Sequence, residues 1–214
     1  MIPEPSSFPI RLKQQLSHGL PGMSSQAKMV PATRRKEILN TKGYLNGRKA
    51  AVLICFYPDH HQNIQLVLIK RNVYDGVHSG QISFPGGKHE QEDTDLVQTA
   101  LREAMEETGI DRHKVQVIGK LSSIYIPPSN YFVQPVLGWL STEPEFVPEV
   151  AEVSEILRIP LSEFSNPGNM QEKEIIHRNS QKMMVPCYYI QGHIIWGATA
   201  MMLSEMIDIL SFEF

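Results

Sequence analysis

Four charged residues, Arg102, Glu103, Glu106 and Glu107, lie within a short stretch near the middle of the chain. Positions three and four apart are neighbours on a helix, so a helix here would bring the three carboxylates together. Arg102 can pair with Glu106, but one guanidinium cannot neutralise three carboxylates within one turn. A divalent cation can, and oxygen ligands that leave room for water suit Mg²⁺ or Mn²⁺. The alternative is a solvated helix face, because Glu is a strong helix former and is usually exposed.

A pair of glycines upstream of these residues favours the metal interpretation. Gly86 and Gly87 follow a proline and precede a polar loop. Since glycine lacks a Cβ atom, the backbone there can approach a ligand closely, and a carbonyl oxygen can join a coordination sphere. We therefore predict a Mg²⁺ or Mn²⁺ site that leaves positions open for a substrate phosphate.

A helix over residues 94–108 would position the carboxylates. Asp95 is the predicted N-cap, Gln98 completes a capping box three positions later, and Gly109 ends the helix. The residues predicted to face the core are Ala100, Leu101, Ala104, Met105 and Thr108.

Apolar and β-branched runs predict strands on both sides of this helix. The predicted strands cover residues 50–57, 64–71, 114–126 and 131–140, and a hairpin through Gln191 and Gly192 covers residues 182–197. Residues 152–160 fit a strand or a helix, residues 161–164 a helical turn, and residues 198–210 a closing helix. This order predicts an α/β or α+β sandwich with a mixed sheet.

The composition is that of one globular domain. The chain has 214 residues, of which 42% are hydrophobic, and a formal net charge of −3. This balance provides no broad basic field, so a polymeric nucleic acid is not an expected partner. The longest apolar run, residues 50–57, is too short to cross a bilayer, and no signal or transit peptide pattern opens the chain. The two cysteines, with Cys55 inside that run, fit a reducing cytoplasm.

The first 48 residues are predicted to form an extension that packs on the main domain, residues 49–214. Two stretches of the extension, residues 8–16 and 31–39, are candidates for short helices. The oligomeric state is left open, with a homodimer as one alternative.

The sequence REAMEETGI, residues 102–110, resembles the second half of the Nudix box, Gly-x5-Glu-x7-Arg-Glu-U-x-Glu-Glu-x-Gly-U with U aliphatic. The first half departs from this pattern, because direct counting places Thr94 at the box glutamate and Lys88 at the box glycine. A one-residue insertion instead aligns Gly87 with the glycine and Asp93 with the glutamate. The resemblance implies a Nudix fold, an α/β/α sandwich with a loop-helix-loop, and a metal-dependent hydrolase.

Residues 66–87, LVLIKRNVYDGVHSGQISFPGG, are similar to the signature of the coenzyme A diphosphatase branch of this family. Further likeness extends from about residue 50 to 210. The branch implies hydrolysis of the diphosphate bond of coenzyme A or an acyl-coenzyme A to 4'-phosphopantetheine and adenosine 3',5'-bisphosphate, so the expected partner is a small nucleotide-type molecule.

The resemblance also implies roles for the acidic residues. Glu103 and Glu107 would be metal ligands, and Gly87 a carbonyl ligand. Glu106 would be a ligand or the base that orients water, while Arg102 would hold the carboxylates in place. A base can also come from a later loop, where Glu152 is the candidate; the alternative is an ordinary acidic loop.

Three residues of the branch signature are candidates for substrate contacts. Lys70 and Arg71 could meet phosphates, since arginine binds them in a fixed fork; as strand-end surface charges they would need no function. His78 could contact the nucleotide or fix the loop by a hydrogen bond.

Two other functions remain open. One is a Nudix hydrolase of ADP-ribose, dinucleotides or nucleoside triphosphates, and the other is a nucleotide-binding module without turnover. The complete set of Glu103, Glu106 and Glu107 favours turnover, because mutually repelling carboxylates would give a pure binder no advantage.

Overall fold

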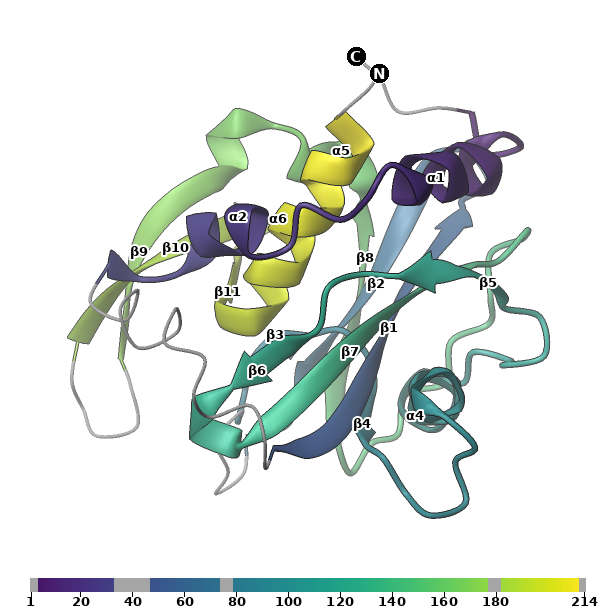
Figure 1. Ribbon diagram of the computed structural model, residues 1–214, viewed down its shortest axis with the longest axis horizontal. Helices are drawn as coiled ribbons and strands as arrows, with labels where there is room; N and C mark the ends of the chain where they lie inside the picture. The colour runs from purple at the N-terminus through teal and green to yellow at the C-terminus, as the bar shows by residue number, and fades with distance from the viewer. Residues whose placement is uncertain (1–3, 33–46, 74–78, 177–181, 212–214) are drawn as a thin grey trace.

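A twisted mixed β-sheet forms the centre of the computed structural model, which describes residues 4–32, 47–73, 79–176 and 182–211 (Figure 1). Its eight strands are β1 (Arg48–Pro58), β2 (Ile64–Arg71), β3 (Ile82–Ser83), β4 (Gly86–Lys88), β5 (Gln116–Lys120), β6 (Ile124–Ile126), β7 (Tyr131–Trp139) and β8 (Val153–Pro160). His78 and most of the predicted helical segment 31–39 lie outside the described residues.

The strand order is β3-β2-β1-β7-β5, and three further strands pair with members of this row, β4 with β1, β6 with β7 and β8 with β2. β1 and β7 run parallel, and the other described pairs of this sheet are antiparallel. A second sheet has the order β11 (His193–Trp196), β10 (Lys182–Ile190) and β9 (Met170–Ile176). Gln191 and Gly192, both at positive φ, form the predicted hairpin turn, as the right-handed twist of the strands requires.

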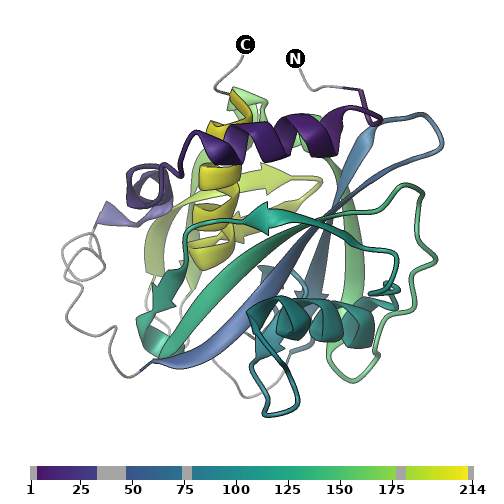
Figure 2. The ribbon, with the colours of Figure 1, turned by 45° about the vertical axis from the view of Figure 1, so that its right-hand side comes forward.

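Helices cover both faces of the main sheet (Figure 2). Alternate residues of β1 enter two separate apolar clusters, because side chains along a strand point to opposite faces. Ile54 and Phe56 belong to the cluster beneath helices α1 (Phe8–Ser17) and α6 (Gly197–Ser211), whereas Leu53 and Cys55 belong to the cluster beneath helix α4 (Leu96–Thr108). The predicted α+β sandwich with a mixed sheet is thus confirmed.

Helix α4 ends at the predicted residue, Thr108, and begins at Leu96, directly after the predicted cap, Asp95. The Asp95 side chain accepts hydrogen bonds from the backbone N–H groups of Val97 and Gln98, and Gly109 ends the helix in the left-handed conformation at φ 75°. The prediction for Met105 was wrong, since this side chain is 45% exposed. Glu107 is buried instead, because the helix is turned so that its buried side includes the carboxylate.

Shorter elements complete the structure. The segment 152–160, which fitted strand or helix, is a strand from residue 153 onward and contains all of β8, and residues 161–164 form the helical turn α5 (Leu161–Phe164). Short helices are α2 (Met23–Gln26), η1 (Ala27–Met29), η4 (Pro127–Ser129) and η5 (Pro167–Asn169). None of the helices in the described ranges combines the length and apolar character needed to cross a membrane.

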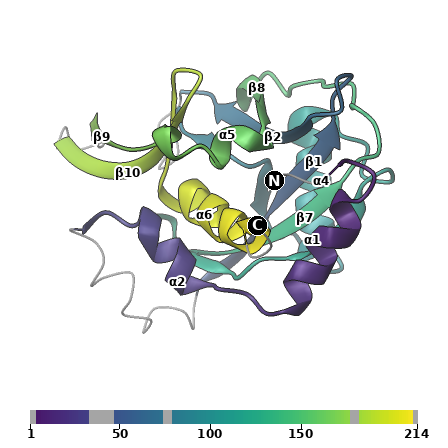
Figure 3. The ribbon, with the colours of Figure 1, turned by 90° about the horizontal axis from the view of Figure 1, so that it is seen from above.

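The N-terminal segment contacts helix α6 and the end of the sheet. Seen from above, α1 and α2 lie along the same side of α6 (Figure 3). Phe8 is fully buried between Phe56 and Trp139, with ring centroids 5.0 and 5.5 Å away. The buried Glu205 of α6 accepts hydrogen bonds from Gly22 N and Gln26 Nε2, at 3.2 and 2.8 Å. The division of the chain at residue 48 stays a prediction.

Replacing Phe8 tests how much this packing stabilises the fold. We expect Phe8→Ala to lower the free energy of unfolding by about 3–5 kcal/mol, because it leaves a cavity between two aromatic rings. Ile10→Ala in the same helix is the control; Ile10 is 63% exposed, and its loss should cost less than about 1 kcal/mol. Urea denaturation measures both, and equal losses would contradict the packing described.

Candidate functional site

Four segments meet beside the last turns of α4: the glycine turn of β4, the loop after it, the end of β2 and the loop before β8. The glycine turn contributes a backbone N–H, the loop after it contributes Asp93, the end of β2 contributes Arg71, and the loop before β8 contributes backbone N–H groups. They are far apart in sequence, so the pairing of β4 with β1 and of β8 with β2 brings them together.

The glycine turn lies so close to its neighbours that side chains would not fit. A Cβ atom on Gly86 would collide with the backbone of Ala51 and Val52, and one on Gly87 would collide with the carboxylate of Glu103. Both glycines therefore allow the backbone to lie directly between strand β1 and helix α4.

Arg102 is held by several groups at once. Its Nε and Nη2 atoms donate to the two carboxylate oxygens of Asp93, each at 2.9 Å, and Nη2 also donates to the carbonyl of Lys88 at 3.0 Å. Nη1 donates to Glu103 and Glu106, both at 3.0 Å. This bidentate arrangement fixes the plane of the guanidinium, so Arg102 ties the loop to two of the three helix carboxylates.

Asp93 anchors Arg102 from the loop. Its side chain is almost fully buried, and it also accepts hydrogen bonds from Glu90 N at 3.0 Å and Thr99 Oγ1 at 2.9 Å. The hydrogen bonds from Arg102 hold the pKa of Asp93 well below its usual range, although burial opposes this. A short acid at this position therefore reaches the arginine, given the loop that the one-residue insertion provides.

Glu107 is the most buried of the helix carboxylates, at 2% exposure. Its Oε2 accepts a hydrogen bond from Gly86 N at 2.7 Å, and its Oε1 lies 3.1 Å from Nη2 of Arg71. That second contact lacks hydrogen-bond geometry, so Oε1 has a charge partner but no donor. Burial raises the pKa of Glu107 to about 7, against the effect of Arg71.

Burial and the surrounding charges also change the pKa of Glu103. Burial raises the pKa of its carboxyl, Arg102 lowers it, and the negative charges of Glu106 and Glu152 raise it further.

The loop that carries Glu152 is attached to the C-terminal end of α4. Val147 N donates to the carbonyl of Thr108 at 2.9 Å, and Glu149 N donates to the carbonyl of Glu107 at 3.1 Å. The side chain of Glu152 is exposed, and its carbonyl accepts from Asn72 N at 2.8 Å. Backbone bonds thus hold the loop of Glu152 against the end of the helix.

The basic pair of β2 divides between the two faces of the sheet. Arg71 points toward α4, where its Nη2 atom donates to the carbonyl of Gly86 at 2.8 Å. Lys70 precedes it on the strand, and adjacent side chains of a strand point to opposite faces. The structure therefore brings Arg71 to the carboxylates and leaves Lys70 on the other face.

The carboxylates suit a divalent cation chemically, although arginines hold them in this structure. In the described ranges, no three His, Cys, Asp or Glu side chains are arranged to hold a metal ion. Both carboxylates nearest the glycine turn contact an arginine, Glu103 contacting Arg102 and Glu107 contacting Arg71. The buried Oε1 of Glu107, which lacks a donor, is an oxygen that a hard cation would satisfy.

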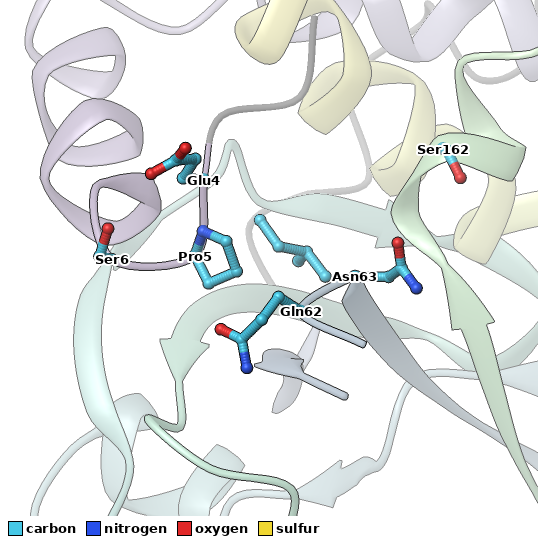
Figure 4. Close-up of a pocket in the computed structure, with 7 residues that line it drawn as sticks. Glu4, Pro5, Ser6, Gln62, Asn63 and Ser162 are labelled. Atoms are coloured by element: carbon cyan, nitrogen blue, oxygen red, sulfur yellow. The ribbon is translucent and has the colours of Figure 1, made fainter. Parts of the chain in front are cut away.

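A hollow of about 560 Å³ lies elsewhere, between the start of α1, the turn after β1 and helix α5 (Figure 4). Glu4, Gln62, Asn63 and Ser162 are among the residues that line it. The turn lies at the far end of β1 from the glycine turn, which pairs with Ala50–Val52, so roughly 20 Å of strand separates the two places. The hollow is therefore not part of the carboxylate site.

Sequence reasoning missed two parts of this site. It did not identify Gly86 as the donor to Glu107, nor the contact between Arg71 and Glu107. The spacing Pro-Gly-Gly was a usable signal for Gly86, but the Arg71 contact depends on the pairing of β2 with its neighbours.

Comparisons with known proteins identify the family of the chain. Residues 47–178 match the family model of the NUDIX domain. The chain is 35% identical over 161 residues to the uncharacterized Nudix hydrolase NudL of Photorhabdus laumondii, covering 75% of this chain and 84% of that protein. It is 34% identical over 158 residues to the mitochondrial Nudix hydrolase 15 of Arabidopsis thaliana, covering 72% and 55%. The solved Nudix hydrolase RenU of M. smegmatis aligns at 20% identity with a TM-score of 0.47, over 56% of this chain and 78% of that one.

The anchoring of Arg102 can be tested by stability. Asp93→Asn should lower the free energy of unfolding by about 3 kcal/mol, because it removes the buried charge that holds Arg102 through two hydrogen bonds. Glu106→Gln removes a partner of the same arginine whose side chain is 54% exposed, so it should cost less than about 1 kcal/mol. Urea titration in EDTA compares them, and a larger loss for Glu106→Gln would exclude Asp93 as the anchor.

Glu107 should make stability depend on pH in the metal-free protein. Its folded pKa of about 7 lies above the ordinary value of 4.5, so the folded state retains a proton that the unfolded state has lost between these values. Stability from this group is therefore greatest below pH 4.5 and declines as pH rises to about 7. Urea denaturation in EDTA at pH 5 and pH 8 measures this loss. Between the two pH values, the free energy of unfolding of Glu107→Gln should fall by roughly 1–3 kcal/mol less than that of the wild type. An identical decline in both proteins would be the contrary result.

Proposed function

The chain belongs to the Nudix family, whose members hydrolyse nucleotide-like substrates with the aid of divalent metal ions, and we propose that its own substrate is coenzyme A or an acyl-coenzyme A. The observation that carries this proposal is the position of the branch signature, residues 66–87. This segment supplies both Arg71 and the glycine turn, and both contact Glu107. The part of the chain that resembles coenzyme A diphosphatases is thus part of the carboxylate site.

Glu103, Glu106 and Glu107 would hold the metal, and the carbonyl of Gly87 would add a ligand. When bound, Mg²⁺ or Mn²⁺ supplies positive charge to the diphosphate oxygens and activates water for attack. Arg102 keeps Glu103 and Glu106 in position through its fixed bonds to Asp93. The products would be 4'-phosphopantetheine and adenosine 3',5'-bisphosphate.

Two carboxylates are proposed to accept the proton of the attacking water. Glu106 has a half-exposed side chain beside Arg102, and Glu152 lies on the loop attached to the end of α4. Glu152 is free of the arginine contacts that engage Glu106, and its charge acts on both Glu103 and Glu107. These features favour Glu152 as the base and Glu106 as a ligand.

The remaining signature residues would contact the substrate. Lys70 stays a predicted phosphate contact, and its side chain lies on the face of the sheet opposite Arg71 and the carboxylates. His78 stays a predicted nucleotide contact outside the described residues.

A substrate panel tests the proposal directly. Coenzyme A, an acyl-coenzyme A, ADP-ribose, NADH and nucleoside triphosphates would each be incubated with Mg²⁺ or Mn²⁺, and kcat/KM measured from the products. We expect coenzyme A or its acyl form to give the highest value. Glu103→Gln should lower that value by about 10²-fold or more, because it removes a charged metal ligand.

Glu145→Gln is the matched control, since Glu145 is exposed in the loop before β8 and takes no part in the site described. It should retain the activity of the wild type. A preference for ADP-ribose would overturn the coenzyme A assignment and leave the metal chemistry standing. A Glu103→Gln variant with the kcat/KM of the wild type would overturn the metal assignment.

A further inference from the structure

Arg71, Gly86 and Glu107 form a closed cycle of polar contacts. Nη2 of Arg71 donates to the Gly86 carbonyl at 2.8 Å, Gly86 N donates to Oε2 of Glu107 at 2.7 Å, and Oε1 of Glu107 lies 3.1 Å from Nη2 of Arg71. The cycle joins the end of β2, the glycine turn and helix α4 through three residues.

The contacts within the cycle differ in kind. Gly86 bonds both partners with good hydrogen-bond geometry, whereas the contact between Arg71 and Oε1 of Glu107 has short distance but lacks that geometry. Arg71 therefore provides Oε1 with a positive charge and not with a donor. A different cation at this oxygen would break no hydrogen bond of Glu107.

Burial explains why some positive charge has to be present. The Glu107 side chain is 3% exposed, and that of Arg71 is 19% exposed. An ionised carboxylate buried to this degree is costly unless a cation lies beside it. Arg71 meets this requirement when no metal is bound, and its side chain is more exposed than that of Glu107.

Arg102 differs from Arg71 in this respect. Arg102 makes two hydrogen bonds to Asp93 and one to the Lys88 carbonyl, so its position does not depend on the metal ligands. Among the described residues, the Arg71 side chain has one carbonyl partner, Gly86, besides Glu107. Of the two arginines, Arg71 is the one that can leave its carboxylate.

We propose that Arg71 is a positioning residue that serves as the counter-ion of Glu107 in the metal-free protein, and that a divalent cation replaces it at Oε1. This rests on the proposed function, because it requires Glu107 to be a metal ligand. It assigns Arg71 a role that acts through Glu107, in addition to the phosphate contact predicted from the sequence.

Thermal unfolding of Arg71→Gln, at pH 8 in EDTA and in saturating Mn²⁺, tests the exchange. In EDTA the variant should melt roughly 6–12 °C below the wild type, because Glu107 loses its counter-ion. In Mn²⁺ the difference should shrink to about half or less, since the cation supplies the missing charge. By linkage, isothermal titration should then show Mn²⁺ binding about tenfold tighter in the variant.

Arg158→Gln is the matched control. Arg158 lies on β8, and it pairs with Glu143 at 3.3 Å with a 57% exposed side chain. Its replacement should change the melting temperature by only a few degrees and by the same amount in EDTA and Mn²⁺.

A double variant shows whether the effect acts through Glu107. In a Glu107→Gln background, Arg71→Gln should cause a much smaller loss in EDTA, because no buried charge remains to be balanced. If Arg71→Gln alone does not fold, the double variant still tests the proposal. It should fold, because Gln at both positions leaves no buried charge without a partner.

The other outcomes each overturn the exchange. An equal loss for Arg71→Gln in EDTA and in Mn²⁺ would make Arg71 a permanent brace of the glycine turn. An unchanged melting temperature in both conditions would show that Arg71 is not the counter-ion of Glu107. A wild type whose melting temperature Mn²⁺ does not raise would instead overturn the metal site, and with it the proposed function.

Discussion

The rest of the site depends on one electrostatic constraint, the need to balance carboxylates that helix α4 holds close together and partly buried. The chain meets it with two arginines from opposite directions. Arg102, on the helix itself, takes its position from Asp93 in the preceding loop and contacts Glu103 and Glu106. Arg71, from strand β2, faces Glu107. A bidentate pair with Asp93 fixes Arg102, whereas Arg71 faces Glu107 through a charge contact without hydrogen-bond geometry, so the two arginines differ in how firmly they are held.

The glycine turn follows from the same constraint. A carboxylate as buried as Glu107 needs a donor, and the nearest backbone N–H is that of Gly86. To bring this N–H to the helix, the turn has to run directly between β1 and α4, where a Cβ atom on Gly86 or Gly87 would collide with its neighbours. The apolar contacts of β1 with α4, such as those of Leu53 and Cys55 in the shared cluster, then set the distance between sheet and helix. Packing of the core and hydrogen bonding of the carboxylate are satisfied by one geometry.

Local patterns made much of this architecture predictable. The Asp95 cap, the Gly109 stop and the turn at Gln191 and Gly192 each depend on a few consecutive residues, and all three were confirmed. The orientation of α4 was not predictable in the same way. Apolar periodicity placed Met105 in the core, but the helix buries Glu107, which contacts Gly86 and Arg71, and leaves Met105 exposed. Arg71 and Glu107 meet only after β2, β1 and β4 have paired, and this register cannot be read from residue spacing.

The end of α4 links the helix to the loop of the proposed base. The last carbonyls of a helix have no partner within it, and here those of Glu107 and Thr108 accept hydrogen bonds from Glu149 N and Val147 N. The loop therefore satisfies the helix terminus while it carries Glu152 toward the carboxylates. These backbone bonds fix where the loop meets the helix, and the side chain of Glu149 also shapes the loop, because it accepts a hydrogen bond from Ala151 N at 3.1 Å. Asn72, which follows Arg71, donates to the carbonyl of Glu152 from the other side. Two consecutive residues at the end of β2 therefore contact different parts of the site. Arg71 faces Glu107, and Asn72 holds the backbone of the loop that carries the proposed base.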